Sequence, residues 1–342
     1  MALKILKADE PYVVEQLVSV IYGAPGIGKT TMGFSTKAPL LLDFDCGGYR
    51  GNIRGDLVKI KSWEDARVIE ESDLEGYSTV IVDTVGGQIE YLQDWVEANF
   101  PKMKNANGLT ISGWGKVKAE FNQWLNKLKR FGKDIVLVSH MDEIQTSDGV
   151  MQERLKIAGG AKAIVYQSAD IMGRLYVDNN QTIFNCIPGE VSFGKCPGRP
   201  EPEGVPEITG ESQFFHEFLA RAKKHLNEMT AAQALVYQAT NEMMEKIALL
   251  AEDPTVEGFN ALSDELTKAP DVIKASCRQE FRAVAENANV SWDKETGLWW
   301  KKDKDVSPPS GVDAEVVKTA ETDGKLAPVQ QALLDENEGV PC

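Results

Sequence analysis

The sequence predicts an α/β fold built on a mostly parallel β-sheet, followed by a small helical module and an acidic tail. Polar or amphipathic stretches separate four short apolar runs: VSVIY (18–22), PLLLDFD (39–45), STVIVD (78–83) and DIVLVSH (134–140). Continuous apolar strands that alternate with helices are typical of a parallel sheet buried on both faces. A glycine-rich loop directly after the first run is the second indication of this fold.

That loop reads GAPGIGKT and matches the pattern G-x4-G-K-[ST] in a strand–loop–helix context. Glycines let the chain turn tightly and let a phosphate approach bare backbone N–H groups. We expect Lys29 to bridge the β- and γ-phosphates of a nucleoside triphosphate and the Thr30 hydroxyl to ligate Mg²⁺, with ATP as the nucleotide. The predicted nucleotide-contacting residues are Gly23, Ala24, Pro25, Gly26, Ile27, Gly28, Lys29, Thr30 and Thr31.

Carboxylates follow two of the other apolar runs. Asp83 ends VIVD and precedes Thr84, which is the Walker B pattern and predicts a ligand of Mg²⁺. Asp43 and Asp45 close the second run, and alternate strand residues point the same way, so both are expected at the phosphate end. We predict Asp45 as the general base that polarises the attacking water, with Asp43 or a glutamate from outside the motif as the alternatives. An ordinary turn aspartate before glycine is the competing interpretation.

Further polar residues follow later strands. His140 ends VLVSH, where it can sense the γ-phosphate and relay hydrolysis into the next loop. A partly buried, hydrogen-bonded histidine is the alternative. Lys195 and Arg199 follow the last strand and are candidates for cations that complete the site of a neighbouring subunit. A solvated loop explains them almost as well.

Composition and charge restrict the function classes. The chain has 342 residues, enough for one large and one small domain, and a net charge of −15. Such a charge argues against a protein that coats nucleic acid through a basic surface. No apolar run has the length of a membrane span, and the first residues lack a signal-peptide core, so we expect a cytoplasmic protein without membrane contact. Five cysteines without C-x-x-C spacing are expected to be reduced thiols.

The strongest helical pattern lies at 113–131, where apolar residues recur at three- and four-residue spacing. Ser112 is the predicted N-cap, and Gly132 marks the end. Because such a stripe is more typical of core packing than of base stacking, we assign it to the core.

The pattern changes after residue 170. Asn179-Asn180 between two apolar runs predicts a hairpin that extends the sheet. A helix at 211–226 then closes the first domain, and Thr230 is expected to begin a separate helical block whose aromatic end forms a short hairpin or a helix end.

We therefore predict three parts: a core at 1–228, a helical accessory domain at 229–302 and a tail at 303–342. Eight acidic residues and two lysines between 305 and 342 make the tail acidic, and its composition predicts disorder.

Together these residues resemble the RecA-like ATPases, and more narrowly the phage RecA-like single-strand annealing recombinases, over roughly 15–225. The matching blocks are GAPGIGKT (23–30), LLDFDCGG (41–48), TVIVDT (79–84), VLVSHMDE (136–143) and GGAKAIVYQSADI (159–171). The resemblance implies that Asp45 replaces a catalytic glutamate, His140 a glutamine switch and Lys195 an intersubunit lysine. It also implies a RecA-like core that forms rings or filaments, and a phage-encoded protein acting in the bacterial cytoplasm.

The family's DNA-binding loops correspond to 101–116 and 142–158. Their candidate DNA contacts are Lys102, Lys104, Trp114, Lys116, Arg154 and Lys156, which combine cations for phosphates with an aromatic ring for stacking. Ordinary solvated loops are an equal alternative. The acidic tail is similar in character to tails that regulate DNA access or recruit single-strand binding proteins.

The sequence thus predicts a Mg²⁺-dependent, DNA-stimulated ATPase that binds single-stranded DNA in recombination or replication. Two alternatives remain open. One is a loader or partner switch, in which ATP sets a conformation and the helical block carries the function. The other is a P-loop kinase for a small molecule, which usually has a lid with several arginines; here arginines after residue 140 are scattered.

Overall fold

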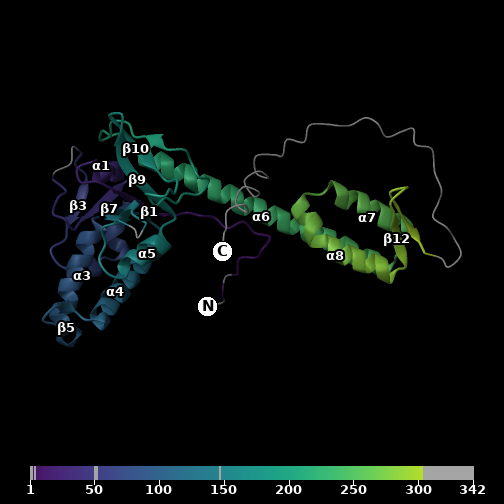
Figure 1. Cartoon of the computed structure of the whole chain (residues 1–342), viewed down its shortest axis with the longest axis horizontal. Coiled ribbons are helices and arrows are strands. Elements are labelled where there is room, and N and C mark those ends of the chain that lie inside the picture. The colour runs from purple at the N-terminus through teal and green to yellow at the C-terminus, as the bar shows by residue number, and fades with distance from the viewer. Residues whose placement is uncertain (1–2, 4, 50–52, 146–147, 303–342) are drawn as a thin grey trace. The chain divides into compact units, whose positions relative to one another are not determined.

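A computed structural model describes residues 3, 5–49, 53–145 and 148–302. It divides into two compact units (Figure 1). One comprises Val14–Leu226, and the other comprises the N-terminal residues up to Val13 together with the chain from Asn227. The acidic tail predicted at 303–342 lies outside the described residues.

The larger unit, over its described residues, is built on a nine-stranded sheet in the order β11-β10-β9-β1-β7-β4-β2-β3, with β8 paired to β7. The strands are β1 Val18–Gly23, β2 Pro39–Asp43, β3 Asp56–Lys59, β4 Thr79–Asp83, β7 Asp134–Gln145, β8 Met151–Leu155, β9 Ile171–Asp178, β10 Gln181–Asn185 and β11 Glu203–Gly204. Pairs from β9 through β1, β7, β4 and β2 to β3 are parallel, whereas β10, β11 and β8 add antiparallel pairs. The predicted mostly parallel α/β fold is confirmed.

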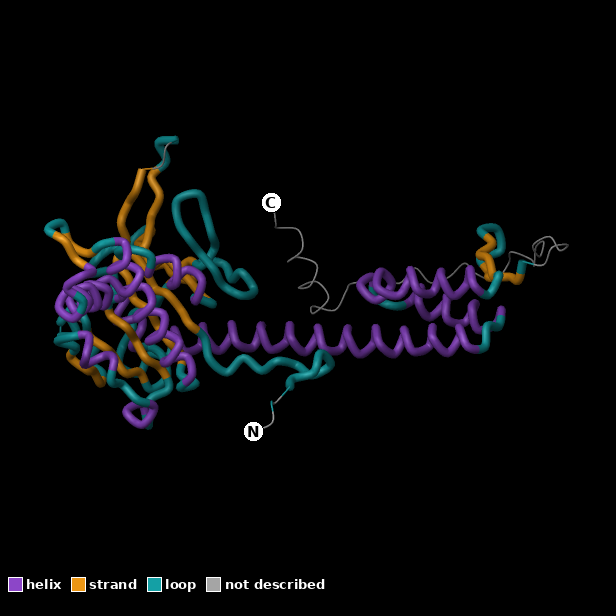
Figure 2. Tube along the Cα trace, turned by 90° about the horizontal axis from the view of Figure 1, so that it is seen from below, coloured by secondary structure: helices purple, strands orange, loops and turns teal. Residues whose placement is uncertain are grey.

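The apolar runs form the centre of this sheet, as predicted. Every residue of β1 and β4 is buried, which requires cover on both faces. The turn between β9 and β10 is formed by Asn179 and Asn180, both with positive φ (47° and 63°), so the predicted hairpin is confirmed. β7 is longer than predicted. Beyond His140 it leaves the buried layer and pairs with β8 as a hairpin that extends from the sheet (Figure 2).

Helices cover the two faces of the sheet. They are α1 Lys29–Phe34, α2 Trp63–Arg67, α3 Val85–Asn99, α4 Ile111–Arg130, α5 Ala161–Ser168 and the start of α6 Phe214–Glu252, with short 3-10 helices η1 Glu71–Leu74 and η2 Pro101–Met103. One apolar cluster packs α2 to α5 against the sheet, and a second joins α1 and the start of α6 to the opposite face. The small hairpin β5 Lys104–Asn105 and β6 Gly108–Leu109 precedes α4.

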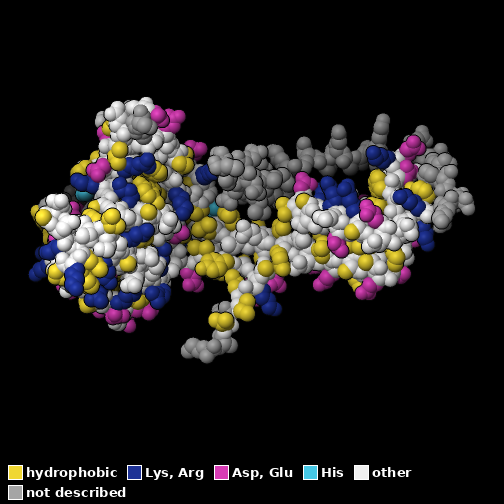
Figure 3. All heavy atoms as spheres, turned by 60° about the horizontal axis from the view of Figure 1, so that its bottom comes forward, with side chains coloured by type: hydrophobic (Ala, Val, Ile, Leu, Met, Phe, Trp, Pro, Cys, Tyr) yellow, Lys and Arg dark blue, Asp and Glu magenta, His cyan; other side chains and the backbone are white. Residues whose placement is uncertain are grey.

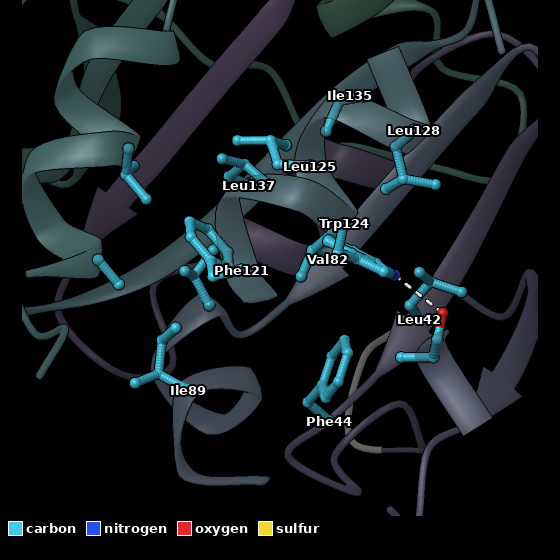
Figure 4. Packing of buried hydrophobic residues seen from close by; sticks show 14 of the residues in the cluster. Leu42, Phe44, Val82, Ile89, Phe121, Trp124, Leu125, Leu128, Ile135 and Leu137 are labelled. Carbon is cyan, nitrogen blue, oxygen red and sulfur yellow. Dashed lines mark hydrogen bonds between the residues drawn. The ribbon is translucent and has the colours of Figure 1, made fainter. Parts of the chain in front are cut away.

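The core assignment of the aromatic stripe is confirmed. Trp124 and Phe121 point from α4 into the first cluster (Figure 4), and the Trp124 Nε1 donates to the Ala66 carbonyl at 2.8 Å. The N-cap prediction is wrong: α4 begins at Ile111, and Thr110 caps it by accepting from the Gly113 N–H. The pattern misplaced the start because Ile111, although apolar, is 94% exposed.

The expected break before Thr230 is also wrong. α6 begins at Phe214 and runs without interruption to Glu252, so it includes residues of both units. Residues 227–229 contain neither Gly nor Pro, and a Thr can stay in a helix by bonding backward. The Thr230 hydroxyl lies within hydrogen-bond distance of two carbonyls, that of Asn227 in the preceding turn of the helix at 3.1 Å and that of Tyr12 at 2.7 Å.

The second unit has a core of its own. α7 Val256–Lys268 and α8 Asp271–Asn287 pack with the later part of α6, and the predicted aromatic hairpin is confirmed as β12 Val290–Asp293 and β13 Leu298–Lys301. Phe259, Phe281 and Trp299 form a cluster of rings at its centre. Among the helices that the structure describes, none is long and apolar enough to cross a membrane.

Replacing Trp124 by Phe should lower the free energy of unfolding by about 1–3 kcal/mol, because the Ala66 carbonyl loses its donor inside the core. Urea denaturation of the full chain measures the change. Gln123→Ala, at an exposed position on the same helix, is the control and should stay within about 0.5 kcal/mol of the parent. Equal stability of the two variants would contradict this account of the core.

Candidate nucleotide-binding site

The glycine-rich loop leaves β1 at the carboxyl end of the parallel strands and enters α1. A side chain at Gly23 would collide with the Leu175 carbonyl of β9, so the loop approaches β9 backbone to backbone. Gly26 and Gly28 adopt positive φ (76° and 99°), which favours glycine. The sequence pattern therefore follows from the loop's shape. Its backbone N–H groups are the donors available to a phosphate.

Lys29 is buried at the base of this loop, with 5% of the residue exposed. Its Nζ donates to the carbonyls of Gly23 (3.1 Å) and Ala24 (2.7 Å). Burial lowers the pKa of Lys29, and the nearby carboxylates of Asp83 and Asp45 oppose that effect. An anion at this position would stabilise the ammonium group further.

Thr30 and Asp83 come together at the end of β4. The Thr30 Oγ1 donates to Asp83 Oδ2 at 2.5 Å, and burial raises the pKa of Asp83 despite this hydrogen bond. A hydroxyl and a carboxylate are oxygen ligands of the kind that Mg²⁺ takes, and the burial of the carboxylate is relieved by a cation. No group of three or more His, Cys, Asp or Glu side chains that could hold a metal occurs among the described residues. The donor set therefore fits Mg²⁺ shared with phosphate oxygens rather than an all-protein metal site.

Asp45 lies beyond the end of β2 and faces the same cavity. The Thr84 Oγ1 donates to its Oδ1 at 2.9 Å, and His140 Nε2 lies 3.5 Å from its Oδ2. Burial by itself raises the pKa of Asp45, but hydrogen bonds from His140 and Thr84 outweigh it and hold the pKa below its ordinary value. Asp45 is therefore ionised near neutral pH, with a side chain that is 32% exposed.

Asp43 is used differently from Asp45. Its carboxylate accepts from the backbone N–H groups of Gly47 and Gly48, both at 2.9 Å, and the residue is 3% exposed. It does not line the cavity, so the expectation that both aspartates face the phosphate end is corrected. β2 ends at Asp43, and the alternation of a strand does not continue to Asp45.

His140 joins the phosphate loop to Asp45. Its Nδ1 lies 3.5 Å from Lys29 Nζ, and its Nε2 faces Asp45 on the other side of the ring. Its carbonyl accepts from the Lys156 N–H at 2.9 Å, at the point where β8 ends. The histidine thus contacts the nucleotide cavity with its side chain and the β7–β8 hairpin region with its backbone.

Sequence reasoning missed Thr84, Gly86 and Gly87. Thr84 caps α3 by accepting from the Gly87 N–H at 3.1 Å while it donates to Asp45. A side chain at Gly87 would collide with Asp45 Oδ1, and one at Gly86 would lie 2.8 Å from the Lys156 carbonyl. Two adjacent glycines in the first turn of a helix are unfavourable for helix formation. Their presence in the sequence was therefore a signal that another part of the chain packs closely against this turn.

The cavity at this loop has a volume of about 680 Å³. Its described lining includes the loop residues Gly26 to Thr31 with Asp45, Asp83 and His140, and on another side 205–210. Lys29 is the only Lys or Arg among these described lining residues. Lys195 and Arg199 lie outside the lining; Lys195 Nζ donates to the Ala169 carbonyl at 2.5 Å, and its backbone bridges Met172.

The first candidate DNA segment is more ordered than the predicted loop. Pro101 to Leu109 forms η2 and the β5–β6 hairpin, where Lys102 and Lys104 are exposed. Trp114 and Lys116 belong to α4. A side chain at Gly159 would lie 2.5 Å from the Trp114 ring, and Lys116 pairs with Glu120 at 2.7 Å, so both are engaged within the fold.

The second candidate segment is also not a simple loop, because β7 and β8 pair through most of 142–155. Arg154 donates to Gln152 at 2.7 Å and lies over the Phe193 ring, 4.3 Å from its centroid. The Lys156 side chain is exposed beside the hydrogen bond to His140. Lys102, Lys104 and Lys156 are therefore the candidates whose side chains face solvent.

Gly87→Ala should slow ATP turnover at least about tenfold and leave ATP affinity within about twofold, because the methyl group displaces Asp45 and leaves the phosphate loop intact. Steady-state hydrolysis and ATP titration measure the two quantities. The control is Gly115→Ala in α4, where a side chain would have no neighbour within 4 Å. Normal turnover in the Gly87 variant would mean that the position of Asp45 does not matter.

Comparison with known proteins is consistent with this site. The family model described as an AAA domain matches residues 15–197, which contain the phosphate loop, Asp45, Asp83 and His140. No curated protein matches the chain. The matched region covers more than half of the sequence and most of the unit that holds the cavity. The chain belongs to the AAA domain family of P-loop ATPases.

Proposed function

We propose that this protein is a Mg²⁺-dependent ATPase that binds single-stranded DNA and acts as an annealing recombinase in phage-type recombination or replication. The observation that carries the proposal is the position of His140. Its ring lies between Lys29 and Asp45, while its carbonyl accepts from Lys156, a candidate DNA contact. One residue therefore joins the nucleotide cavity to the surface that we assign to DNA.

Binding begins at Lys29. A triphosphate replaces the Gly23 and Ala24 carbonyls as the partner of its Nζ and gives this buried ammonium group a full counter-charge. Thr30 and Asp83 would hold Mg²⁺, which when bound neutralises charge on the phosphate oxygens. The loop N–H groups hold the remaining phosphate oxygens.

Asp45 then orients the attacking water. Because its pKa is lowered, the carboxylate is ionised and accepts a hydrogen bond from water at neutral pH. Thr84 holds one carboxylate oxygen, which limits the rotation of the group. The His140 ring lies between the other carboxylate oxygen of Asp45 and the Lys29 ammonium group. A change in the charge of the phosphates therefore changes the electrostatic environment of both neighbours of this ring.

Assembly of several copies is part of the proposal. Phosphoryl transfer is commonly accelerated by a cation that reaches the γ-phosphate in addition to the loop lysine. Among the described lining residues, Lys29 is the only Lys or Arg, which is compatible with a second cation from a neighbouring copy. We propose that Lys195 or Arg199 of a neighbouring copy supplies it in a ring or filament.

Asp45→Asn should lower the rate of ATP hydrolysis at least about a hundredfold and leave ATP affinity within about twofold, because only the acceptor for water is weakened. Lys29→Ala should instead weaken ATP binding at least about tenfold. Titration calorimetry and steady-state hydrolysis separate the two effects. Asp178→Asn, at an exposed position at the end of β9, is the control.

Two outcomes would count against these roles. Unchanged ATP binding in the Lys29 variant would defeat the assignment of the phosphate loop. Normal hydrolysis in the Asp45 variant would place the general base on another residue.

Single-stranded DNA is proposed to contact Lys102, Lys104 and Lys156. On the face of the larger unit that Figure 3 shows, Lys and Arg side chains are mixed with acidic and apolar ones, so contact through a few lysines fits this face better than a continuous basic track. These lysines are exposed in the segments that the resemblance assigns to DNA.

Replacing Lys102, Lys104 and Lys156 together by Gln should weaken binding to a labelled single-stranded oligonucleotide and reduce the slope of log affinity against log salt by about 2, from about 0.7 for each lost phosphate contact. Fluorescence anisotropy at several salt concentrations measures both. Lys37, Lys59 and Lys61, changed together to Gln, form a control of equal charge at exposed positions. A wild-type slope in the first variant would exclude these lysines from the DNA contact.

One alternative keeps a specific observation in its favour. The unit from Asn227 has its own apolar core, which suits a loader or partner switch in which this unit carries the function. A rate of ATP hydrolysis that does not change when single-stranded DNA is added, together with intact ATP binding, would favour the loader or partner-switch role. The kinase alternative has no such observation in its favour.

A further inference from the structure

One wall of the nucleotide cavity is not explained by phosphate binding. Residues 205–210 (VPEITG) follow β11, and every one of them contributes to the lining of the cavity. The sequence motifs gave no role to this segment. It belongs to the same compact unit as the phosphate loop.

The segment is held at both ends. The Val205 N–H donates to the Thr182 carbonyl at 2.7 Å and continues the pairing of β11 with β10. Beyond the segment, the Phe215 N–H donates at 3.0 Å to the side chain of Ser35, which caps the end of α1. Residues 205–210 are therefore anchored to the sheet and to the helix that follows the phosphate loop.

Strand order decides which end of the nucleotide meets this wall. Asp83 ends β4, Asp45 follows β2, and His140 lies where β7 leaves the buried layer; these three strands are on one side of β1. β9, β10 and β11 lie on the other side of β1, and 205–210 follows β11. If the γ-phosphate and Mg²⁺ lie toward the catalytic carboxylates, the nucleoside must extend toward 205–210.

The side chains of this wall suit a nucleoside. Val205 and Ile208 line the cavity together with Ile27 of the phosphate loop, and all three pack against the same apolar cluster. An apolar surface accepts the face of a base. Glu207 lines the cavity and is exposed to it. A carboxylate beside a polyanion is unfavourable unless it accepts a hydrogen bond, and the ribose hydroxyls are the donors that a nucleotide offers there.

We propose that residues 205–210 form the nucleoside subsite and that Glu207 selects ribonucleotides by accepting hydrogen bonds from the ribose hydroxyls. The inference rests on the proposed nucleotide binding at the phosphate loop and extends it to the sugar. It assigns Glu207 to recognition only, because the residue lies across β1 from Asp45 and Asp83.

The test compares three ligands by titration calorimetry of the full chain with Mg²⁺: ATP, 2′,3′-dideoxyadenosine triphosphate and inorganic tripolyphosphate. The parent protein should bind ATP about tenfold more tightly than the dideoxy analogue, as expected for a hydrogen bond to a charged group. Glu207→Ala should reduce this preference to about onefold. The ratio of the affinities for ATP and for the dideoxy analogue does not depend on the negative charge that Glu207→Ala removes, because both ligands carry the same phosphates. Glu201→Ala, at an exposed position outside the lining, should keep the parent's ratio.

An unchanged ratio in the Glu207 variant, or no preference in the parent, would overturn the inference. Lys29→Ala separates that result from a failure of the proposed function. If Lys29→Ala weakens all three ligands while Glu207→Ala changes no ratio, only the ribose assignment fails. If Lys29→Ala affects none of them, the phosphate site itself is wrong.

Discussion

The hydrogen bonds that converge on Asp45 determine the arrangement of the rest of the site. Thr84 from the start of α3 and His140 from β7 meet one carboxylate that lies beyond the end of β2. Each partner has a second bond: Thr84 caps its helix, and the His140 carbonyl accepts from Lys156. Because a partly buried carboxylate is costly without donors, these elements are constrained to meet at the same point. The glycine at 87 is required by the same approach.

The sequence predicted the sheet well because its strands are buried on both faces and therefore read as continuous apolar runs. The loop motif pointed to Lys29 and Thr30, and the end of an apolar strand pointed to Asp83; the structure brings Thr30 and Asp83 together, while their roles toward nucleotide and Mg²⁺ stay predictions. Thr84 could not be found in this way, because its role depends on contact with Asp45 across two strands. The continuity of α6 was missed for another reason. Helix ends are marked by weak local signals, and the Thr230 hydroxyl has acceptors in the Asn227 carbonyl of the same helix and in the distant Tyr12 carbonyl.

The wall at 205–210 illustrates a third limit of sequence reasoning. Its residues come about 180 positions after the phosphate loop and carry no motif, yet strand order returns them to the cavity. Pro- and Gly-rich composition before β11 predicted only irregular structure. What fixes the segment is its pairing to Thr182 and the bond from α6 to Ser35, both of them long-range contacts. Two segments far apart in sequence, the phosphate loop and 205–210, thus line the same cavity.

The two sides of β1 therefore present different kinds of side chains to the cavity. On the side of β7, β4 and β2, the cavity is lined by carboxylates and His140, groups that respond to charge. On the side of β9 to β11, the described lining combines apolar residues with Thr182, Thr209 and a single carboxylate, groups that respond to shape and to hydroxyl groups. Hydrolysis changes the charge of the phosphates and leaves the nucleoside unaltered. Under the proposed roles, the structural response to hydrolysis starts at His140 and passes to the β7–β8 hairpin. Residues 205–210 keep their contacts with the nucleoside of the product.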